Sequence, residues 1–341
     1  MNKINITNWL LTRKCNLKCE YCRIVKNYDN QPKEYPPMSW YYKNEMDTET
    51  VIKGLEKIKL HNPDCFHIFY GGEPLLRPDL PDIINYCNNS KINYTIISNN
   101  TPEIQPLMKN LEYIEGFTAS IDPIIFDKKY YLTDMFKKSM EGMDKLKEYS
   151  GKIKDLVAEI TVTNENIKYL YTLLEVLTNS GINSDITFID ISKSKYYDFS
   201  CIEDTNLLVN KTQDVKNIIE TIINSNLNVH MKDTLLLKIY DILPSELDCG
   251  IEKDFHNMTI DADGSLRLCL RCRAIETPNK FNIKNILDDN GNLNKNIAEV
   301  ITRDKKNYCK GCGWTCMIMS KMISDEQENS KNLVHEEIRK N

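Results

Sequence analysis

Six short apolar segments recur along the first two thirds of the chain, and longer stretches with helical periodicity separate them. The apolar segments are 6–11, 66–70, 94–98, 116–121, 156–162 and 186–191. Their length and their β-branched and aromatic residues predict strands. Strands that alternate with helices indicate a parallel sheet covered by helices, so the pattern predicts an α/β fold of six β/α units.

The helical stretches show apolar faces of their own. Val51, Leu55 and Ile58 are spaced for one face of a helix, and Asp47 precedes them at the position of an N-cap. A second face, which we interpret as core packing, comprises Leu132, Phe136, Met140 and Met143. Residues 25–45 have no clear period, so we expect a long ordered loop there.

Right-handed crossovers curl such a sheet toward a barrel, so we expect a partial (β/α)6 barrel of the TIM type. Ligand sites in these folds lie at the carboxyl ends of the strands. We divide the chain into a barrel core at 1–225, a small domain with a β-hairpin and helix at 226–320, and a charged tail at 321–341.

Composition narrows the class of protein. The 341 residues are 41% hydrophobic and 27% charged, as in an ordinary globular chain of one or two domains. The net charge of -5 argues against a non-specific nucleic-acid binder, which would be basic. No apolar run has the length of a membrane span, and residues 1–5 lack the apolar core of a signal peptide. We therefore expect a cytoplasmic protein without nucleic-acid or membrane partners.

In the cytoplasm the twelve cysteines should be reduced, so metal ligation explains them better than disulfides. Nine of them fall in two groups, at 15–22 and 249–316. Cys65, Cys87 and Cys201 stand alone, and we expect them to be small buried hydrophobic side chains.

The first group, Cys15, Cys19 and Cys22, forms a C-x3-C-x2-C run directly after the first predicted strand. Iron–sulfur clusters normally take four cysteines, so a three-cysteine loop would leave one iron without a protein ligand. An open coordination position is where a metal site performs chemistry. The spacing resembles the cluster loop of the radical S-adenosylmethionine (SAM) enzymes.

A second motif, Gly71, Gly72, Glu73 and Pro74, follows the second predicted strand. Glycines let a backbone approach a ligand closely, and a carboxylate accepts hydrogen bonds from an ammonium group. Alone, these residues would equally describe a tight turn. One β/α unit after the cysteine run, they resemble the radical SAM motif that contacts the amino group of the methionine moiety of SAM.

Weaker matches follow the later strands. Ser98 and Asn99 stand where the superfamily often has Thr-Asn-Gly, although Asn100 replaces the glycine. Ser120 and Asp122 stand where it often has Ser-x-Asp, which implies a contact of Ser120 with the ribose or carboxylate of SAM. Further expected contacts are Thr161 in the pocket and Tyr21 against the adenine. An ordinary cap, turn or structural aromatic is the alternative for each.

The resemblance implies that Cys15, Cys19 and Cys22 ligate a [4Fe–4S] cluster whose fourth iron is chelated by SAM. An electron, delivered by a flavodoxin- or ferredoxin-type donor, would cleave the S–C5′ bond and release methionine. The resulting 5′-deoxyadenosyl radical would abstract a hydrogen atom from the substrate. The cofactor carries this chemistry, and the protein supplies orientation and excludes water.

The second cysteine group flanks a predicted hairpin, because Asp263-Gly264 between 259–260 and 266–268 is a hairpin signal. Its members are Cys249, Cys269, Cys272, Cys309, Cys312 and Cys316. They resemble the auxiliary-cluster domain of radical SAM enzymes, called SPASM in its long form and twitch in its short form. No cysteine follows the last of them, so the long form is incomplete and one auxiliary [4Fe–4S] cluster is implied.

The ligands that the resemblance implies are Cys249, Cys269, Cys309 and Cys312, and Cys316 or Cys272 could replace one of them. A four-cysteine zinc ribbon is the competing interpretation, since two C-x2-C pairs are present. The position of Cys249 relative to Gly264, the extra Cys316 and the upstream motifs argue against zinc.

The resemblance predicts a radical SAM enzyme of the oxidoreductase or maturase type that modifies a ribosomally made peptide or protein. A radical SAM dehydrogenase or epimerase of a small metabolite is the alternative. A non-enzymatic iron–sulfur or zinc-ribbon protein is a third, against which the open three-cysteine site argues. The first predicted strand begins at residue 6, so we expect no leader-recognition domain. Its absence would favour a small molecule, a core peptide or a separate peptide-recognition partner.

Overall fold

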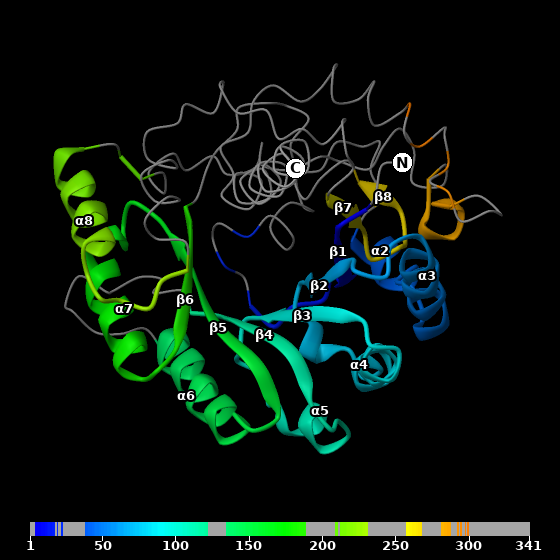
Figure 1. Cartoon of the computed structure of the whole chain (residues 1–341), viewed down its shortest axis with the longest axis horizontal. Helices are drawn as coiled ribbons and strands as arrows, with labels where there is room; N and C mark the ends of the chain where they lie inside the picture. Colours follow the sequence, from blue (N-terminus) through cyan, green and yellow to red (C-terminus); the bar gives the residue numbers. More distant parts are fainter. Residues whose placement is uncertain are drawn as a thin grey trace, which may run out of the picture.

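A curved eight-stranded sheet forms the centre of the molecule, with the strand order β6-β5-β4-β3-β2-β1-β7-β8 (Figure 1). The structure is a computed structural model. It describes residues 4–17, 19, 22, 38–121, 134–188, 209–210, 212–230, 257–267, 281–287, 292, 294, 297 and 299.

Six parallel strands make up most of this sheet. They are β1 (Ile6–Thr12), β2 (Phe66–Gly71), β3 (Asn93–Ser98), β4 (Ile114–Ser120), β5 (Ile153–Val162) and β6 (Asn183–Phe188). Each strand pairs in parallel with the next along the chain. All six strands expected from the apolar segments are therefore confirmed, and the end of the last one beyond residue 188 lies outside the described residues.

Helices lie along the convex side of the sheet (Figure 1). They are α3 (Thr48–His61), α4 (Leu80–Asn89), α5 (Gln105–Lys109), α6 (Asp134–Glu148), α7 (Leu170–Asn179) and α8 (Gln213–Ile223). Short 3-10 turns are η1 (Pro74–Leu76), η2 (Ile167–Tyr169) and η5 (Ile283–Asn285). Leu55 and Ile83 of the helices join Phe117 and Ile160 of the strands in one buried apolar cluster, which fixes helices and sheet relative to each other.

Helix α3 begins and packs as its sequence predicts. The side chain of Asp47 accepts a hydrogen bond from the backbone N–H of Thr50 at 2.8 Å, which satisfies one of the free donors of the first turn. Val51, Leu55 and Ile58 are fully buried. For the second apolar face, Met143 in α6 is buried and Met140 packs against the core, whereas Leu132 lies outside the described residues.

The loop expected over residues 25–45 is wrong for its last part, because residues 38–43 form the helix α2 (Met38–Lys43). Six residues are less than two helical turns, so no apolar period can mark such a helix in the sequence. The backbone N–H of Asn44 donates to the carbonyl oxygen of Trp40 at 3.0 Å and closes its end.

A hairpin from the C-terminal part of the chain completes the sheet. Strands β7 (Asn257–Ile260) and β8 (Leu266–Arg267) are antiparallel, and Gly264 has a φ of +82° in the turn between them, as the Asp-Gly signal predicts. Strand β7 also pairs in parallel with β1, from Ile6 opposite Asn257 to Trp9 opposite Ile260. The hairpin is thus continuous with the barrel sheet and lies beside the strand that leads into the first cysteine run.

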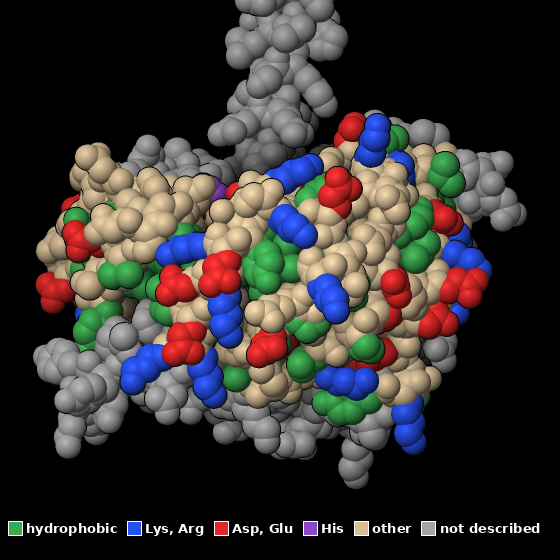
Figure 2. Space-filling view, turned by 90° about the horizontal axis from the view of Figure 1, so that it is seen from below, with side chains coloured by type: hydrophobic (Ala, Val, Ile, Leu, Met, Phe, Trp, Pro, Cys, Tyr) green, Lys and Arg blue, Asp and Glu red, His purple; other side chains and the backbone are tan. Residues whose placement is uncertain are grey.

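The surface carries charges of both signs, interspersed on the face shown in Figure 2. Among the described residues, no helix has the length and apolar character needed to cross a membrane. Cys65 and Cys87 are buried as expected, and burial raises the pKa of each thiol to about 12. Cys201 lies outside the described residues.

Candidate functional site

The cysteine loop, residues 13–22, begins directly after β1, and residues 13–17, 19 and 22 of it are described. Cys15, Cys19 and Cys22 are each half-buried. The backbone N–H of Cys22 donates to the carbonyl oxygen of Cys19 at 3.0 Å, which brings these two residues into one turn. The backbone N–H of Leu17 donates to Sγ of Cys15 at 3.4 Å. Three thiols are thus presented on one short, partly accessible segment.

The glycine turn after β2 is joined to this loop through backbone hydrogen bonds. The N–H of Gly72 donates to the carbonyl oxygen of Thr12 at 2.7 Å, and the N–H of Glu73 donates to that of Lys14 at 2.8 Å. A Cβ atom on Gly72 would lie 2.2 Å from the carbonyl oxygen of Lys14. Gly71 has a φ of +153°, which side chains rarely adopt. The motif therefore needs its glycines for close approach to the cysteine loop.

Glu73 joins the ends of two strands. Its side chain is fully buried, and Oε1 accepts hydrogen bonds from the backbone N–H of Leu75 and the Oγ of Ser98, each at 2.9 Å. Oε2 accepts from the backbone N–H of Asn99 at 2.8 Å. Burial raises the pKa of this carboxyl to about 7 against the lowering effect of these three hydrogen bonds. Pro74 is buried at the start of η1.

Asn99 connects the end of β3 to the cysteine loop. Its Nδ2 donates to Oδ1 of Asn16 at 2.9 Å and approaches Sγ of Cys15 at 3.7 Å. Asn100 has a φ of +57° and is buried. Asparagine is among the few residues other than glycine that adopt this conformation readily, so the backbone here is one that glycine would also favour.

Cysteine thiols are the donors that iron–sulfur clusters take, and three of them lie on this loop. Among the described residues, no group of three His, Cys, Asp or Glu side chains that could hold a metal ion is found. The donors aimed at Sγ of Cys15, from Leu17 and Asn99, are hydrogen bonds of the kind that cluster thiolates accept.

The surroundings of Cys15 disfavour its thiolate form in the protein alone. The pKa of its thiol is raised, chiefly by burial and further by the nearby Cys22 thiol and Glu73 carboxyl, against the hydrogen bonds from Leu17 and Asn99. A bound metal reverses this balance, because thiols lose their protons when they coordinate.

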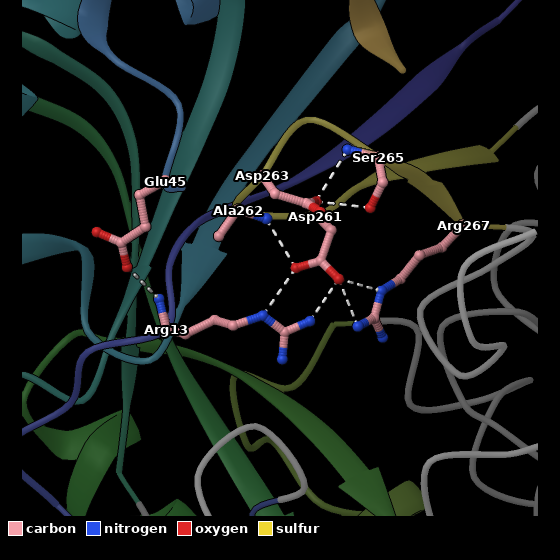
Figure 3. A network of polar contacts seen from close by, with 7 residues as sticks. All are labelled: Arg13, Glu45, Asp261, Ala262, Asp263, Ser265 and Arg267. Carbon is pink, nitrogen blue, oxygen red and sulfur yellow. Dashed lines mark hydrogen bonds and ion pairs between the residues drawn. The ribbon is translucent and has the colours of Figure 1, made fainter. Parts of the chain in front are cut away.

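Glu45 also holds the start of the cysteine loop, through contacts with three consecutive residues. Its Oε1 accepts from Oγ1 of Thr12 at 2.7 Å and from the backbone N–H of Arg13 at 3.0 Å. Its Oε2 lies 3.4 Å from Nζ of Lys14. Figure 3 shows Glu45 reaching the backbone of Arg13. Sequence reasoning missed Glu45, which follows α2 and belongs to no motif.

Arg77 is a second residue that the sequence analysis missed. Its Nη1 donates to the carbonyl oxygen of Leu11 at 2.7 Å and its Nη2 to that of Met46 at 3.0 Å. Asp79 forms an ion pair with Nη2 at 2.6 Å. The position of Arg77, three residues after the Gly-Gly-Glu-Pro run, is the one local signal that could have indicated it.

The other expected contacts remain predictions. Ser120 and Thr161 are half-buried at the ends of β4 and β5, on the sheet edge where the cysteine loop begins. Parallel strands bring their carboxyl ends to one edge, so these positions suit a shared pocket. The remaining predicted residues lie outside the described part of the chain: Tyr21, Asp122, Cys249, Cys269, Cys272, Cys309, Cys312 and Cys316.

Comparison with known proteins agrees with this geometry. Residues 9–177 match the family model described as the Radical SAM superfamily. A GTP 3′,8-cyclase of Campylobacter jejuni is 27% identical over 203 residues, which cover 57% of this chain and 58% of the relative. The radical SAM cyclopropyl synthase TigE of Paramaledivibacter caminithermalis is 25% identical over 229 residues, 62% of this chain and 46% of the relative. The chain thus spans about half the length of these curated relatives.

Solved structures share the fold. The crystal structure of Streptococcus suis SuiB bound to S-adenosylmethionine superimposes with a TM-score of 0.54 at 15% identity, over 79% of this chain and 61% of that one. The structure of anSMEcpe with AdoMet and the Cp18Cys peptide gives 0.54 at 17% identity, over 83% and 78%. At such identities the likeness concerns the fold, and it confirms the predicted α/β class with a partial barrel.

Proposed function

We propose, from the premise that residues 9–177 form a radical SAM superfamily domain, that the protein cleaves SAM reductively and abstracts a hydrogen atom from a substrate. The proposal rests on the backbone hydrogen bonds that connect the glycine turn after β2 to the start of the cysteine loop. Gly72 and Glu73 donate backbone hydrogen bonds to the strand end and loop that carry Cys15. Superfamily membership implies a [4Fe–4S] cluster and SAM, and we assign their binding to these two motifs.

Each motif has a separate task in this proposal. Cys15, Cys19 and Cys22 would hold the cluster, which supplies the electron that breaks SAM. A carboxylate has about four acceptor positions, and three of those of Glu73 are filled. We assign the remaining position to the ammonium of SAM. Ser98 and Asn99, held by the same carboxylate, would then form the adjoining wall.

We further propose one auxiliary [4Fe–4S] cluster held by Cys249, Cys269, Cys309 and Cys312, with Cys272 or Cys316 as a replacement for one of them. The hairpin of β7 and β8, which precedes Cys269, supports this part of the proposal because it forms at the expected residues. A flavodoxin- or ferredoxin-type protein would deliver electrons, and we expect the enzyme to act in the cytoplasm.

For the substrate we propose a peptide, on the resemblance of the C-terminal cysteine set to the domain of peptide-modifying enzymes. A small metabolite is the second candidate. The similarity to a GTP 3′,8-cyclase, 27% identical over 203 residues, favours this candidate, because GTP is a small molecule. The two candidates predict different donors of the hydrogen atom.

Anaerobic turnover tests the proposal. The reconstituted, reduced protein should convert SAM to 5′-deoxyadenosine, measured by mass spectrometry, and the Cys15→Ala/Cys19→Ala/Cys22→Ala variant should not. Cys87→Ala, which removes an isolated buried cysteine, is the matched control and should retain the activity. Formation of 5′-deoxyadenosine by the triple variant would contradict the assignment of these three cysteines as cluster ligands. Deuterium transfer to 5′-deoxyadenosine from a labelled peptide, compared with labelled GTP, separates the two substrate classes.

A further inference from the structure

One carboxylate binds two arginines beside the cysteine loop (Figure 3). Asp261 follows β7 and is fully buried. Its Oδ1 accepts from Nε of Arg13 at 2.9 Å and from the backbone N–H of Ala262 at 2.7 Å. Its Oδ2 forms ion pairs with Nη2 of Arg13 and, at 2.5 Å, with Nη2 of Arg267. The Nε of Arg267 also donates to Oδ2, at 2.6 Å.

The charge of this group is fixed at neutral pH. Burial alone would raise the pKa of Asp261, but the guanidinium groups of Arg13 and Arg267 lower it to about 2. A buried ion network is a poor source of stability, because apolar residues of similar volume often replace one without loss. Its two-point contacts do fix the orientation of the arginines.

Each arginine of this network lies close to a cysteine in the sequence. Arg13 comes two residues before Cys15, and Arg267 comes two residues before Cys269. Asp261 lies well beyond residue 177, where the matched domain ends. The pairing of β7 with β1 carries its carboxylate to the start of the cysteine loop.

The hairpin also contacts the residue next to Glu45, the side chain that holds the backbone of Arg13. The carbonyl oxygen of Ala262 accepts a hydrogen bond from the backbone N–H of Met46 at 2.7 Å. Met46 follows Glu45, whose carboxylate binds the backbone N–H of Arg13. The side chain of Arg13 is thus held by the hairpin itself, and its backbone is held by Glu45, whose neighbour Met46 the hairpin contacts.

We propose that Asp261 is a positioning residue of the SAM site, which fixes through Arg13 the segment that carries Cys15. The inference rests on the proposed function. It adds that the site of the matched domain is completed by a residue from the C-terminal hairpin. In Figure 3, Arg267 shares the carboxylate but approaches it from the side away from the backbone of Arg13, so it serves as an internal comparison.

Titration of SAM into the reduced, reconstituted full chain tests the proposal, with the EPR spectrum as the readout, because only a cluster with an open iron responds to SAM. Arg13→Gln and Asp261→Asn should each raise the half-saturating SAM concentration at least tenfold. Arg267→Gln, the matched control, should change it less than twofold. Arg13→Lys keeps the charge without the two-point contact, so it should give an intermediate shift. The double variant of Arg13 and Asp261 should be no worse than the worse single variant, because both remove one interaction.

A merely structural network would behave differently. Equal SAM shifts in Arg13→Gln and Arg267→Gln, or an unchanged half-saturation in Arg13→Gln, would overturn the proposal. Far-UV circular dichroism identifies a variant that fails to fold, and if Asp261→Asn does, the two substitutions of Arg13 carry the comparison. A wild-type cluster that ignores SAM would instead contradict the proposed function. In that case the SAM-free spectra still test the positioning role, since Arg13→Gln should alter the line shape and Arg267→Gln should not.

Discussion

At the scale of single residues, Glu73 has a structural task, to which our proposal adds the binding of SAM by the same buried carboxylate. Three donors from Leu75, Ser98 and Asn99 hold it between the ends of β2 and β3. The sequence motif indicates the binding task alone. The structural task depends on a contact with the third strand, which no motif spacing can indicate.

Glu73→Ala should weaken SAM binding and leave the iron content intact. Loss of a hydrogen bond to a charged group costs about 1.5–3 kcal/mol, or roughly a tenfold to hundredfold loss of affinity. Equilibrium binding of SAM to the reconstituted protein measures the change. Glu49→Ala, which removes an exposed carboxylate on α3, is the control and should have no effect. Unchanged affinity in Glu73→Ala would mean that the turn is only structural.

The titration of Glu73 should also make stability depend on pH. Its pKa rises on folding from 4.5 to about 7, so the folded state binds more protons than the unfolded state between these values. The contribution of Glu73 to stability should therefore be fully present below pH 4.5 and should be lost as the pH rises through about 7. Relative to Glu73→Gln, the cluster-free wild type should lose roughly 2 kcal/mol between pH 5 and 8 in urea unfolding. Parallel pH profiles for the two proteins would contradict this assignment.

At the scale of elements, the glycine turn works because two backbones touch. Gly72→Ala would place a methyl group against the carbonyl oxygen of Lys14, so the cysteine loop must move. We expect loss of the first cluster, seen as a drop in iron content and in the EPR signal that responds to SAM. Gly151→Ala is the matched control, because a Cβ there has no atom within 4 Å. Normal cluster content in Gly72→Ala would show that the turn tolerates displacement.

The sequence predicts elements well where a pattern repeats within them. All six parallel strands and α3 follow from apolar spacing, and the turn at Gly264 follows from Asp-Gly. Helix α2 is too short to show a period. The pairing of β7 with β1 and the contacts of Glu45 and Asp261 join residues far apart in the chain. No local pattern encodes such contacts, so the motifs indicate the site and the structure supplies its supports.

At the scale of the whole molecule, metal content decides between one auxiliary cluster and its alternatives. The reconstituted protein should contain about eight irons, four in each cubane. Two auxiliary clusters would give about twelve irons, and a zinc ribbon about four irons and one zinc. The triple alanine variant of the cysteine loop should retain about four irons. Stoichiometric zinc would contradict the proposed auxiliary cluster, but it would not affect the assignment of residues 9–177 to a radical SAM domain.

Cys249→Ala should separate the two halves of the chemistry. We expect it to lower the iron content and to impair turnover of the substrate. Cleavage of SAM without substrate should change much less, because we assign that step to the cluster that Cys15, Cys19 and Cys22 would hold. Equal loss of both activities would contradict a separate auxiliary cluster.

The place of β1 between β2 and β7 sets an order of events during synthesis on the ribosome. Strand β2 emerges soon after β1, but β7 begins only at residue 257. Until then one side of β1 has unpaired backbone groups, as any edge strand does, and contacts across so long a stretch of chain form slowly. The ion pair between Arg13 and Asp261 likewise cannot form until residue 261 has been synthesised. The first cysteine run therefore gains these supports only after the hairpin has been made, so insertion of the first cluster should follow the synthesis of the chain through residue 261.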